Sequence, residues 1–421
     1  MSGRLAMFGG SRAVVLDDGD RARLAWPVVT EAERSAVLAV LDRGGFTSVG
    51  SGGAVVRRLE SGWAEFTGTR HCAAVASGTA ALELALAAAD LEPGAQIVVP
   101  ALSFVASAFA PLRQRVEPVF ADIGPRTFTL DPAAAAAAIT PRTRALMAVH
   151  LHGLPCEMDE LRELAARHEL LLVEDAAQAH AAGYRGRQAG ALGDIAAFSL
   201  NVSKNLPTAG EGGLVTTDDA ALHDRVVLHR QFGERIPDRG PRGYVSEVVA
   251  GNAKLGALQA AFTLGQLAAL PERAAGRDRN IRALLSQLSE LPGLLSPQTG
   301  EDRRHAWHML RFRFDVGAMG HPEVAPGAMR AVLERALRAE GVPVRRYQCL
   351  PLPAQPALAG REGYRTGRYP VTEAVLEDSL TLQGWHLNPA GGQVLLRCAE
   401  AFHKVWGQLD LLASLARQEV A

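Results

Sequence analysis

The chain has 421 residues, of which 48% are hydrophobic, and it contains 42 glycines and 23 prolines. A chain of this length and composition can bury a large core, and we expect it to fold into two lobes. The 44 basic residues nearly cancel the 45 acidic ones, so no field of one sign is available to attract nucleic acid or an anionic membrane. Small-molecule chemistry is therefore the expected activity.

Cysteine usage and hydropathy predict the compartment. The four cysteines, Cys72, Cys156, Cys349 and Cys398, lie far apart and form no CxxC pair, which favours reduced thiols over a zinc or redox site. Neither the N-terminus nor any later stretch holds the apolar run that a signal peptide or a membrane-spanning helix needs. We expect a soluble cytoplasmic protein with no metal.

Between about residues 70 and 220, short apolar runs alternate with longer helical patterns, as in parallel strands joined by crossover helices. The fold class is therefore α/β, with a mostly parallel seven-stranded sheet flanked by helices. We expect an N-terminal arm (1–25), a large domain (26–260) and a smaller α+β domain (261–421). The predicted strands of the large domain are 72–77, 96–102, 117–122, 145–153, 170–176, 194–200 and 212–219.

The first of these strands ends in Ser77-Gly78-Thr79, and a strongly helical alanine-leucine run follows at once. Free N–H groups and the positive end of a helix favour a phosphate, and Gly78 lets a ligand approach closely. The two hydroxyls can donate further hydrogen bonds. An ordinary capped helix is the alternative.

The second strand leads to Phe104, which is bracketed by Ser103 and Ser107. An aromatic ring at a strand end can stack on a planar ligand, although core packing is the alternative. The fifth strand delivers Glu174 and Asp175 together at its end. A carboxylate there needs a cationic partner, and a protonated pyridine nitrogen is one such partner.

Lys204 is one of only three lysines, with Lys254 and Lys404, and it lies between a predicted strand and a glycine-rich turn. A lysine amine can form a Schiff base with an aldehyde such as pyridoxal phosphate (PLP) if its neighbours lower its pKa. A plain loop lysine is the alternative. Lys404 is predicted to be a solvated residue at the edge of an amphipathic helix, and Lys254 to start a helix.

Ligands of open α/β sheets bind beyond the carboxyl ends of the strands. Ser77, Phe104, Asp175 and Ser199 all lie at or just after such ends, so they are predicted to converge on one pocket.

The rest of the chain predicts a long helix that links the lobes and then an α+β lobe. The helical pattern covers 251–288 and is interrupted by Pro271. Apolar runs predict strands at 307–314 and 393–399, and amphipathic spacing predicts helices at 323–341 and 404–418.

These motifs, read in order, resemble the DegT/StrS-type family of PLP-dependent sugar and cyclitol aminotransferases, which have fold type I, the aspartate aminotransferase-like architecture. The resemblance covers most of the chain. The segments that carry it are ASGTAALELAL, VVPALSFVASAFA, AVHLHGLPCEMDEL, VEDAAQAHAAG, SKNLPTAGEGGLVTTDD and GNAKLGALQAA.

The resemblance implies that PLP is the cofactor and that Lys204 holds it covalently and moves the proton in catalysis. Asp175 would pair with the pyridine nitrogen, Gln178 would lie near the 3'-hydroxyl side, and Phe104 would stack on the ring. Gly78, Thr79 and Ser199, beside Ser77, would bind the phosphate.

Asn252, which matches the family's GxNxRM segment, would reach the phosphate of a neighbouring subunit. The resemblance therefore implies a homodimer with shared active sites. The sequence departs from the family pattern at Lys254-Leu255, where Arg-Met is usual, and at Pro353, where histidine is frequent. Substrate contacts at these positions therefore cannot be transferred from the family, because lysine and arginine differ at bidentate sites.

The segments TAGEGG and TLQGWHL are more similar to the cyclitol branch of the family than to nucleotide-sugar enzymes. We expect transfer of an amino group from glutamine or glutamate to a keto sugar or a scyllo-inosose-like keto cyclitol in secondary-metabolite biosynthesis. His386, in the second segment, has either a polar contact with the substrate or a structural role.

Other functions stay open from the sequence. A 3-amino-5-hydroxybenzoate synthase-like enzyme would couple imine formation to dehydration and aromatisation, and a nucleotide-keto-sugar aminotransferase would use a larger acceptor. A metal hydrolase could use His150, His152, His180 and Asp175, because HxH can chelate. A PLP-binding regulator would need an added DNA-binding module, for which the first 25 residues are too short.

Overall fold

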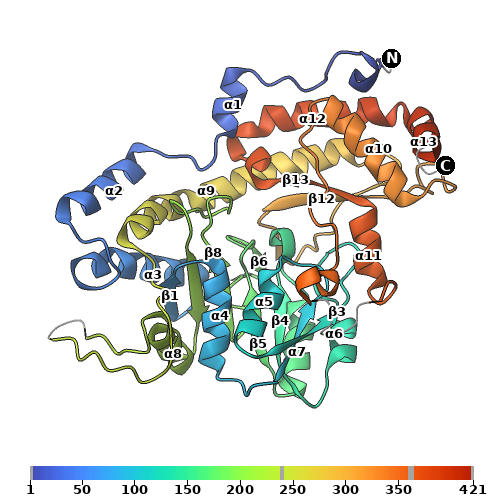
Figure 1. Cartoon of the computed structure of the whole chain (residues 1–421). Coiled ribbons are helices and arrows are strands. Elements are labelled where there is room, and N and C mark those ends of the chain that lie inside the picture. The colour runs from blue at the N-terminus through green and yellow to red at the C-terminus, as the bar shows by residue number, and fades with distance from the viewer. Residues whose placement is uncertain (1–2, 238–240, 359–364, 419–421) are drawn as a thin grey trace.

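The computed structural model describes residues 3–237, 241–358 and 365–418, and its centre is a seven-stranded sheet (Figure 1). The strand order is β1-β9-β8-β5-β4-β2-β3, and β9 runs antiparallel to both of its neighbours while the other pairs are parallel. Every one of the seven predicted strands is present. Their bounds are β1 His71–Val75, β2 Gln96–Pro100, β3 Glu117–Ala121, β4 Thr143–Val149, β5 Leu171–Asp175, β8 Ile195–Ser199 and β9 Gly213–Thr217.

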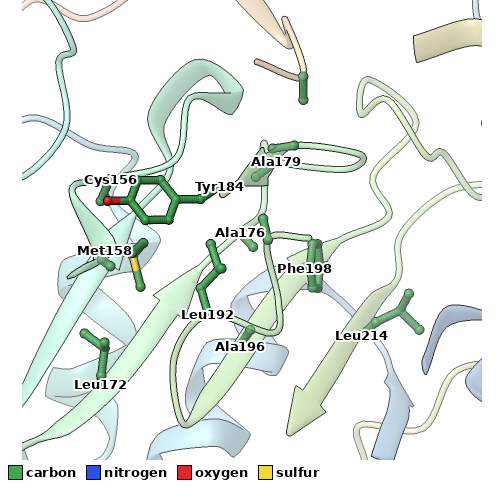
Figure 2. Close-up of a cluster of buried hydrophobic side chains, with 14 of the residues drawn as sticks. Cys156, Met158, Leu172, Ala176, Ala179, Tyr184, Leu192, Ala196, Phe198 and Leu214 are labelled. Carbon is green, nitrogen blue, oxygen red and sulfur yellow. The ribbon is translucent and has the colours of Figure 1, made fainter. Parts of the chain in front are cut away.

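Helices cover both faces of this sheet, because its strands alternate two sets of apolar side chains. One set packs with α3 (Gly53–Thr67), α6 (Pro132–Ala138) and α7 (Met158–Arg167). Figure 2 shows part of this core, with Leu172, Ala196, Phe198 and Leu214 projecting from β5, β8 and β9. The other set packs with α4 (Gly78–Ala89), α5 (Ala106–Arg113) and α8 (Ala220–Arg230).

The C-terminal part forms a smaller lobe around a three-stranded antiparallel sheet. Its strands are β10 (Leu294–Leu295), β12 (Met309–Phe314) and β13 (Ser379–Gln383), in the order β10-β12-β13. The helices of this lobe are α10 (Pro326–Ala339), α11 (Pro370–Glu377), α12 (Gly392–Trp406) and α13 (Leu409–Gln418). A third small sheet consists of β11 (Arg303–Arg304), β6 (Gly183–Tyr184) and β7 (Arg187–Gln188).

Helix α9 (Ala257–Leu288) lies between the two lobes, and Figure 1 shows it running beneath α12. The predicted division at residue 260 falls inside this helix and stays a prediction. The N-terminal segment, with α1 (Asp18–Leu24), packs on the small lobe, since Leu5 and Val14 belong to that lobe's core. Helix α2 (Glu31–Arg43) then packs on α9.

Three predictions for the C-terminal part were wrong. Pro271 does not interrupt the helix, which continues through it. Residues 393–399 form α12 rather than a strand, because Val394, Leu395, Cys398 and Phe402 bury one helical face at a spacing of three to four residues. The predicted helix at 404–418 is two helices, since α12 ends at Trp406 and α13 begins at Leu409.

Lys404 is also not the solvated residue that was predicted. Its amine donates hydrogen bonds to the Ser11 carbonyl at 2.7 Å and to the buried Glu340 carboxylate at 2.8 Å. Glu340 also accepts from the N–H groups of Ala6 and Ala13. This carboxylate therefore fastens the N-terminal segment to the small lobe. Among helices of the described ranges, none is both long and apolar enough to cross a membrane.

Candidate active site

A cavity of about 590 Å³ opens at the carboxyl ends of β1, β2, β4, β5 and β8, which is the size of a small-molecule pocket. The four strand-end residues predicted to converge, Ser77, Phe104, Asp175 and Ser199, all line it. The large lobe also contributes Gly78, Thr79, Gln178 and Lys204, and the small lobe closes the cavity with His308, Met309, Tyr347, Gln383 and Gly384.

One end of the cavity is the N-terminus of α4. Ser77 is the N-cap, and its Oγ accepts from the Ala80 N–H at 3.1 Å. The N–H groups of Gly78 and Thr79 occupy the first two helical positions and have no acceptor within the helix. A Cβ at Gly78 would lie 2.6 Å from the Ser199 Cβ, so only glycine lets the helix end sit against β8. This end is built to receive an anion.

Asp175, the last residue of β5, also lines the cavity and is 6% exposed. Its Oδ2 accepts from the Ser107 hydroxyl at 2.7 Å, and its Oδ1 accepts from the Ala177 N–H at 3.2 Å. Ser107 is in turn 2.7 Å from the Ser103 hydroxyl. Within the described ranges no basic side chain hydrogen-bonds this carboxylate. A cationic group inside the cavity is therefore needed to pair with its negative charge.

Gln178 and Phe104 also line the cavity. The Gln178 side-chain oxygen accepts from the backbone N–H of His152 at 2.7 Å, which fixes the amide beside Asp175. Phe104 lies two residues before α5 and is 56% exposed. A large apolar ring left this exposed in a cavity wall is available to contact a bound ligand.

Lys204 lies in the loop between β8 and β9, and its amine reaches the cavity. Its backbone is held on both sides, because its N–H donates to the Asn201 carbonyl at 2.8 Å and its carbonyl accepts from the Trp26 indole at 3.2 Å. Burial lowers the pKa of Lys204 to about 8, although the charges of Asp175 and Glu211 raise it. An amine with this pKa is partly neutral near physiological pH and is therefore nucleophilic.

Glu174 and the three histidines of the metal hypothesis have other partners. Glu174 accepts from His150 Nε2 at 2.9 Å and from three backbone N–H groups between residues 190 and 193. His152 Nε2 accepts from Arg311 at 3.0 Å. His180 does not reach the cavity and lies against the rings of Trp63 and Phe198. The described residues contain no group of three or more His, Cys, Asp or Glu side chains that could hold a metal.

Sequence reasoning missed the small-lobe side of the cavity. His308 immediately precedes β12, and burial, together with the nearby Lys204 charge, lowers the pKa of His308 well below its ordinary value. Tyr347 lies beside Gln178, and Gln383 ends β13. A polar residue directly before the strand β12 was the available signal for His308, and the polar and apolar alternation of SLTLQ was the signal for Gln383. No local pattern marks Tyr347.

Three residues singled out in the sequence lie outside this cavity. Asn252 is exposed and pairs with Gln231 in an isolated antiparallel bridge. Lys254 does not start a helix; it precedes α9 and places its amine 4.4 Å from the centre of the Phe232 ring. His386 lines a separate small cavity of about 40 Å³ between the N-terminal segment and the small lobe, which favours its structural role.

Comparison with known proteins agrees with this geometry. Residues 27–389 match the model of the DegT/DnrJ/EryC1/StrS aminotransferase family. A dTDP-3-amino-3,4,6-trideoxy-alpha-D-glucose transaminase of Streptomyces venezuelae is 37% identical over 358 residues, which are 85% of this chain and 88% of that protein. An L-glutamine:2-deoxy-scyllo-inosose aminotransferase of Streptomyces lividus is 39% identical over 350 residues, 81% of this chain and 80% of that protein.

The fold is also that of solved relatives. The crystal structure of a 3-amino-5-hydroxybenzoic acid synthase matches with a TM-score of 0.79 and 31% identity, over 90% of this chain and 98% of that one. The family match covers most of this chain, including every strand of the central sheet. From its sequence and its fold, the chain belongs to the DegT/DnrJ/EryC1/StrS aminotransferase family.

Proposed function

We propose that this aminotransferase uses PLP held covalently by Lys204, and that it moves an amino group from glutamine or glutamate to a keto sugar or keto cyclitol. The observation that carries the proposal is the arrangement of three groups in one cavity. The Lys204 amine, the Asp175 carboxylate and the N-terminus of α4 all face the same space. An aldehyde, a basic ring nitrogen and a phosphate on one small molecule would satisfy all three.

The phosphate end fits PLP because its donors are unused. Gly78 and Thr79 offer backbone N–H groups at a helix N-terminus, and the hydroxyls of Thr79 and Ser199 line the same part of the cavity. The missing Cβ at Gly78 leaves the helix end in contact with Ser199. Each of these groups would bind and orient the phosphate.

The ring end fits PLP because Asp175 is a buried carboxylate without a cationic hydrogen-bond partner in the described chain. A protonated pyridine nitrogen would supply that partner, and Ser107 and the Ala177 N–H hold the carboxylate in position for it. Phe104 would cover one face of the ring. Gln178 would lie at the 3'-hydroxyl side, where its amide is already fixed by His152.

When bound, PLP withdraws electrons from the carbon that carries the amino group and so acidifies its proton. Lys204 is the base that this chain places in the cavity to take up that proton at Nζ and return it. Burial, which lowers the pKa of Lys204 to about 8, lets the amine both hold and release a proton near neutral pH. The small-lobe residues His308, Tyr347 and Gln383 would keep bulk water out and contact the substrates.

For the acceptor we favour a scyllo-inosose-like ketone with glutamine as donor. The similarity to the 2-deoxy-scyllo-inosose enzyme supports this choice. Two alternatives are supported by the other relatives: a nucleotide-linked keto sugar, and a cyclic substrate that is dehydrated and aromatised as in 3-amino-5-hydroxybenzoate synthases. Incubation with one acceptor of each class shows which acceptor gains an amino group, and aromatisation alone also creates a new ultraviolet chromophore.

We also propose that the active form is a homodimer in the cytoplasm. Asn252 is exposed and lies outside the cavity of its own chain, as a residue that serves a neighbouring subunit would. Two chains would then build each site.

The attachment site can be tested directly because the chain has only three lysines. The purified protein is loaded with PLP, reduced with borohydride, digested and mapped by mass spectrometry. We expect the pyridoxyl mass on the peptide that contains Lys204. Lys204→Ala should lose the visible absorbance of the bound cofactor, whereas Lys404→Arg should keep it. Label on Lys254 or Lys404 alone, or no label at all, would contradict the proposal.

A further inference from the structure

The face of the small-lobe sheet that is turned toward the large lobe is polar. Along β12 the side chains alternate: Leu310, Phe312 and Phe314 belong to the core of the small lobe, while Met309 lines the active-site cavity. Arg311 lies two residues beyond Met309 on the same side of the strand and is only 2% exposed. This arginine is therefore buried between the lobes, next to the cavity.

Among the described residues Arg311 has three hydrogen-bond partners, and none of these three is a carboxylate. Nε donates to His152 Nε2 at 3.0 Å, and the two terminal nitrogens donate to the Ser379 hydroxyl at 2.7 Å and to the Gln348 side-chain oxygen at 2.8 Å. Burial lowers the pKa of Arg311 to about 10. A buried cation that is satisfied only by neutral acceptors is tolerated when each acceptor keeps its place.

Two of the three partners of Arg311, Gln348 and His152, are themselves hydrogen-bonded toward the residues that would hold the cofactor ring. Gln348 donates to the Ser103 carbonyl at 2.8 Å, the Ser103 hydroxyl is 2.7 Å from that of Ser107, and Ser107 donates to Asp175 at 2.7 Å. The second path is shorter, because the backbone N–H of His152 donates to Gln178 at 2.7 Å.

His152 makes the second path rigid. Its Nε2 accepts a hydrogen bond, so the imidazole is neutral, and burial together with the Arg311 charge lowers the pKa of His152 well below its ordinary value. Its backbone is held at a φ of 60°, a left-handed conformation that a non-glycine residue keeps only when its surroundings enforce it.

We infer that Arg311 is a positioning residue, which acts from the small lobe through Gln348 and His152 to fix Asp175 and Gln178 against the bound cofactor. The inference rests on the proposed function, since it assigns those two residues to the ring. Arg311 contacts neither the cofactor nor the substrates in this role. It makes the geometry of the ring site depend on how the two lobes are joined.

Arg313 is a matched control. It lies on the same side of β12 and also crosses to the large lobe, where it donates to the Pro125 carbonyl at 3.1 Å. It is paired with Asp378 at 2.9 Å, and its described contacts do not lead to Asp175 or Gln178. Loss of Arg313 therefore weakens the junction of the lobes without releasing the ring-side residues.

The experiment compares Arg311→Gln, Arg311→Lys and Arg313→Gln with the wild type, as full-length chains stripped of cofactor and titrated with PLP. Both glutamine variants should lower the thermal unfolding midpoint of the stripped protein. Of these two glutamine variants, only Arg311→Gln should weaken PLP binding, by about tenfold, and change the visible circular dichroism of the bound cofactor. Arg313→Gln should stay within about twofold of the wild type.

Arg311→Lys keeps the positive charge but loses the planar guanidinium that donates to three acceptors. It should therefore bind PLP as weakly as Arg311→Gln. Wild-type affinity and circular dichroism in either Arg311 variant would overturn the inference. If Arg311→Gln does not fold, Gln348→Leu cuts the path to Ser103 without removing the buried charge. That variant should still shift the circular dichroism, and an unchanged spectrum would overturn the inference. A wild type without Lys204-dependent absorbance would instead overturn the proposed function.

Discussion

Lys204 lies near two carboxylates, Asp175 and Glu211, whose charges favour its protonated form. Burial outweighs both and lowers the pKa of the amine to about 8 from an ordinary value of 10.5. Desolvation is thus the larger effect, and the carboxylates keep it from lowering the pKa further. The balance suits the roles proposed for this amine, first as a nucleophile and then as a base.

The rate at which the stripped protein captures PLP should therefore depend on pH with a midpoint near 8. Below this pH the amine is protonated and not nucleophilic, so the rate should fall about tenfold per pH unit. Stopped-flow absorbance between pH 6 and about 10 measures it. Asp175→Asn removes a charge that raises the pKa, so its midpoint should be lower. A midpoint near that of a free lysine would contradict the assignment.

At this scale the sequence correctly predicted that four strand-end residues of the large lobe converge on one cavity. Ser77, Phe104, Asp175 and Ser199 were found because parallel strands deliver their carboxyl ends to one edge, which is a property of each strand and its order. His308 and Tyr347 were missed because they reach the cavity only through the packing of one lobe on the other. Lys404 was misjudged because its partner, Glu340, is 64 residues away in the chain.

The N-terminal turn of α4 is the proposed phosphate site. In Gly78→Ala the new Cβ would meet the Ser199 Cβ at 2.6 Å, so the helix end must move away from β8. We expect PLP affinity to fall by about tenfold, with a smaller loss of stability. Equilibrium titration measures the affinity.

Gly243→Ala is the control for this change, because a Cβ at Gly243 would meet nothing within 4 Å. It should leave both affinity and stability unchanged. If Gly78→Ala binds PLP as the wild type does, the helix end is not the phosphate site.

The contact of Lys404, on α12, with Glu340 and the N-terminal segment should affect the stability of the protein rather than its activity. Lys404→Met leaves the buried Glu340 carboxylate with only backbone donors, and we expect a loss of about 2–3 kcal/mol in the free energy of unfolding. Urea denaturation followed by circular dichroism measures this loss. Arg21→Met breaks a fully exposed pair with Asp18 and should cost much less. Equal losses in the two variants would show that Glu340 does not depend on Lys404.

Elements differ in how well a local pattern predicts them. All seven strands of the large sheet were predicted, because strands that are buried on both faces are short continuous apolar runs between turn residues. Residues 393–399 look the same locally but form a helix, since the apolar spacing that identifies α12 extends to Val405, beyond the run itself. A short apolar run does not distinguish the two structures.

For the whole molecule, the proposed homodimer makes a prediction that a single chain cannot satisfy. Lys204→Ala and Asn252→Ala should each be nearly inactive. When the two variants are mixed and allowed to exchange subunits, one site of each mixed dimer has both residues intact, so activity should recover to about a quarter of the wild type. An assay of transamination before and after exchange measures this, and lack of recovery in confirmed mixed dimers would exclude shared sites.

The alternation along β12 has a consequence for how this enzyme can change its substrate. Met309 and Arg311 face the cavity and its supporting contacts, whereas Leu310 and Phe312 face the small-lobe core. Neighbouring residues of this one strand therefore have separate roles. Mutational drift at Met309 can explore new acceptors while Leu310 and Phe312 keep the lobe folded, so directed evolution of specificity should begin at Met309 and its cross-strand neighbour Gln383.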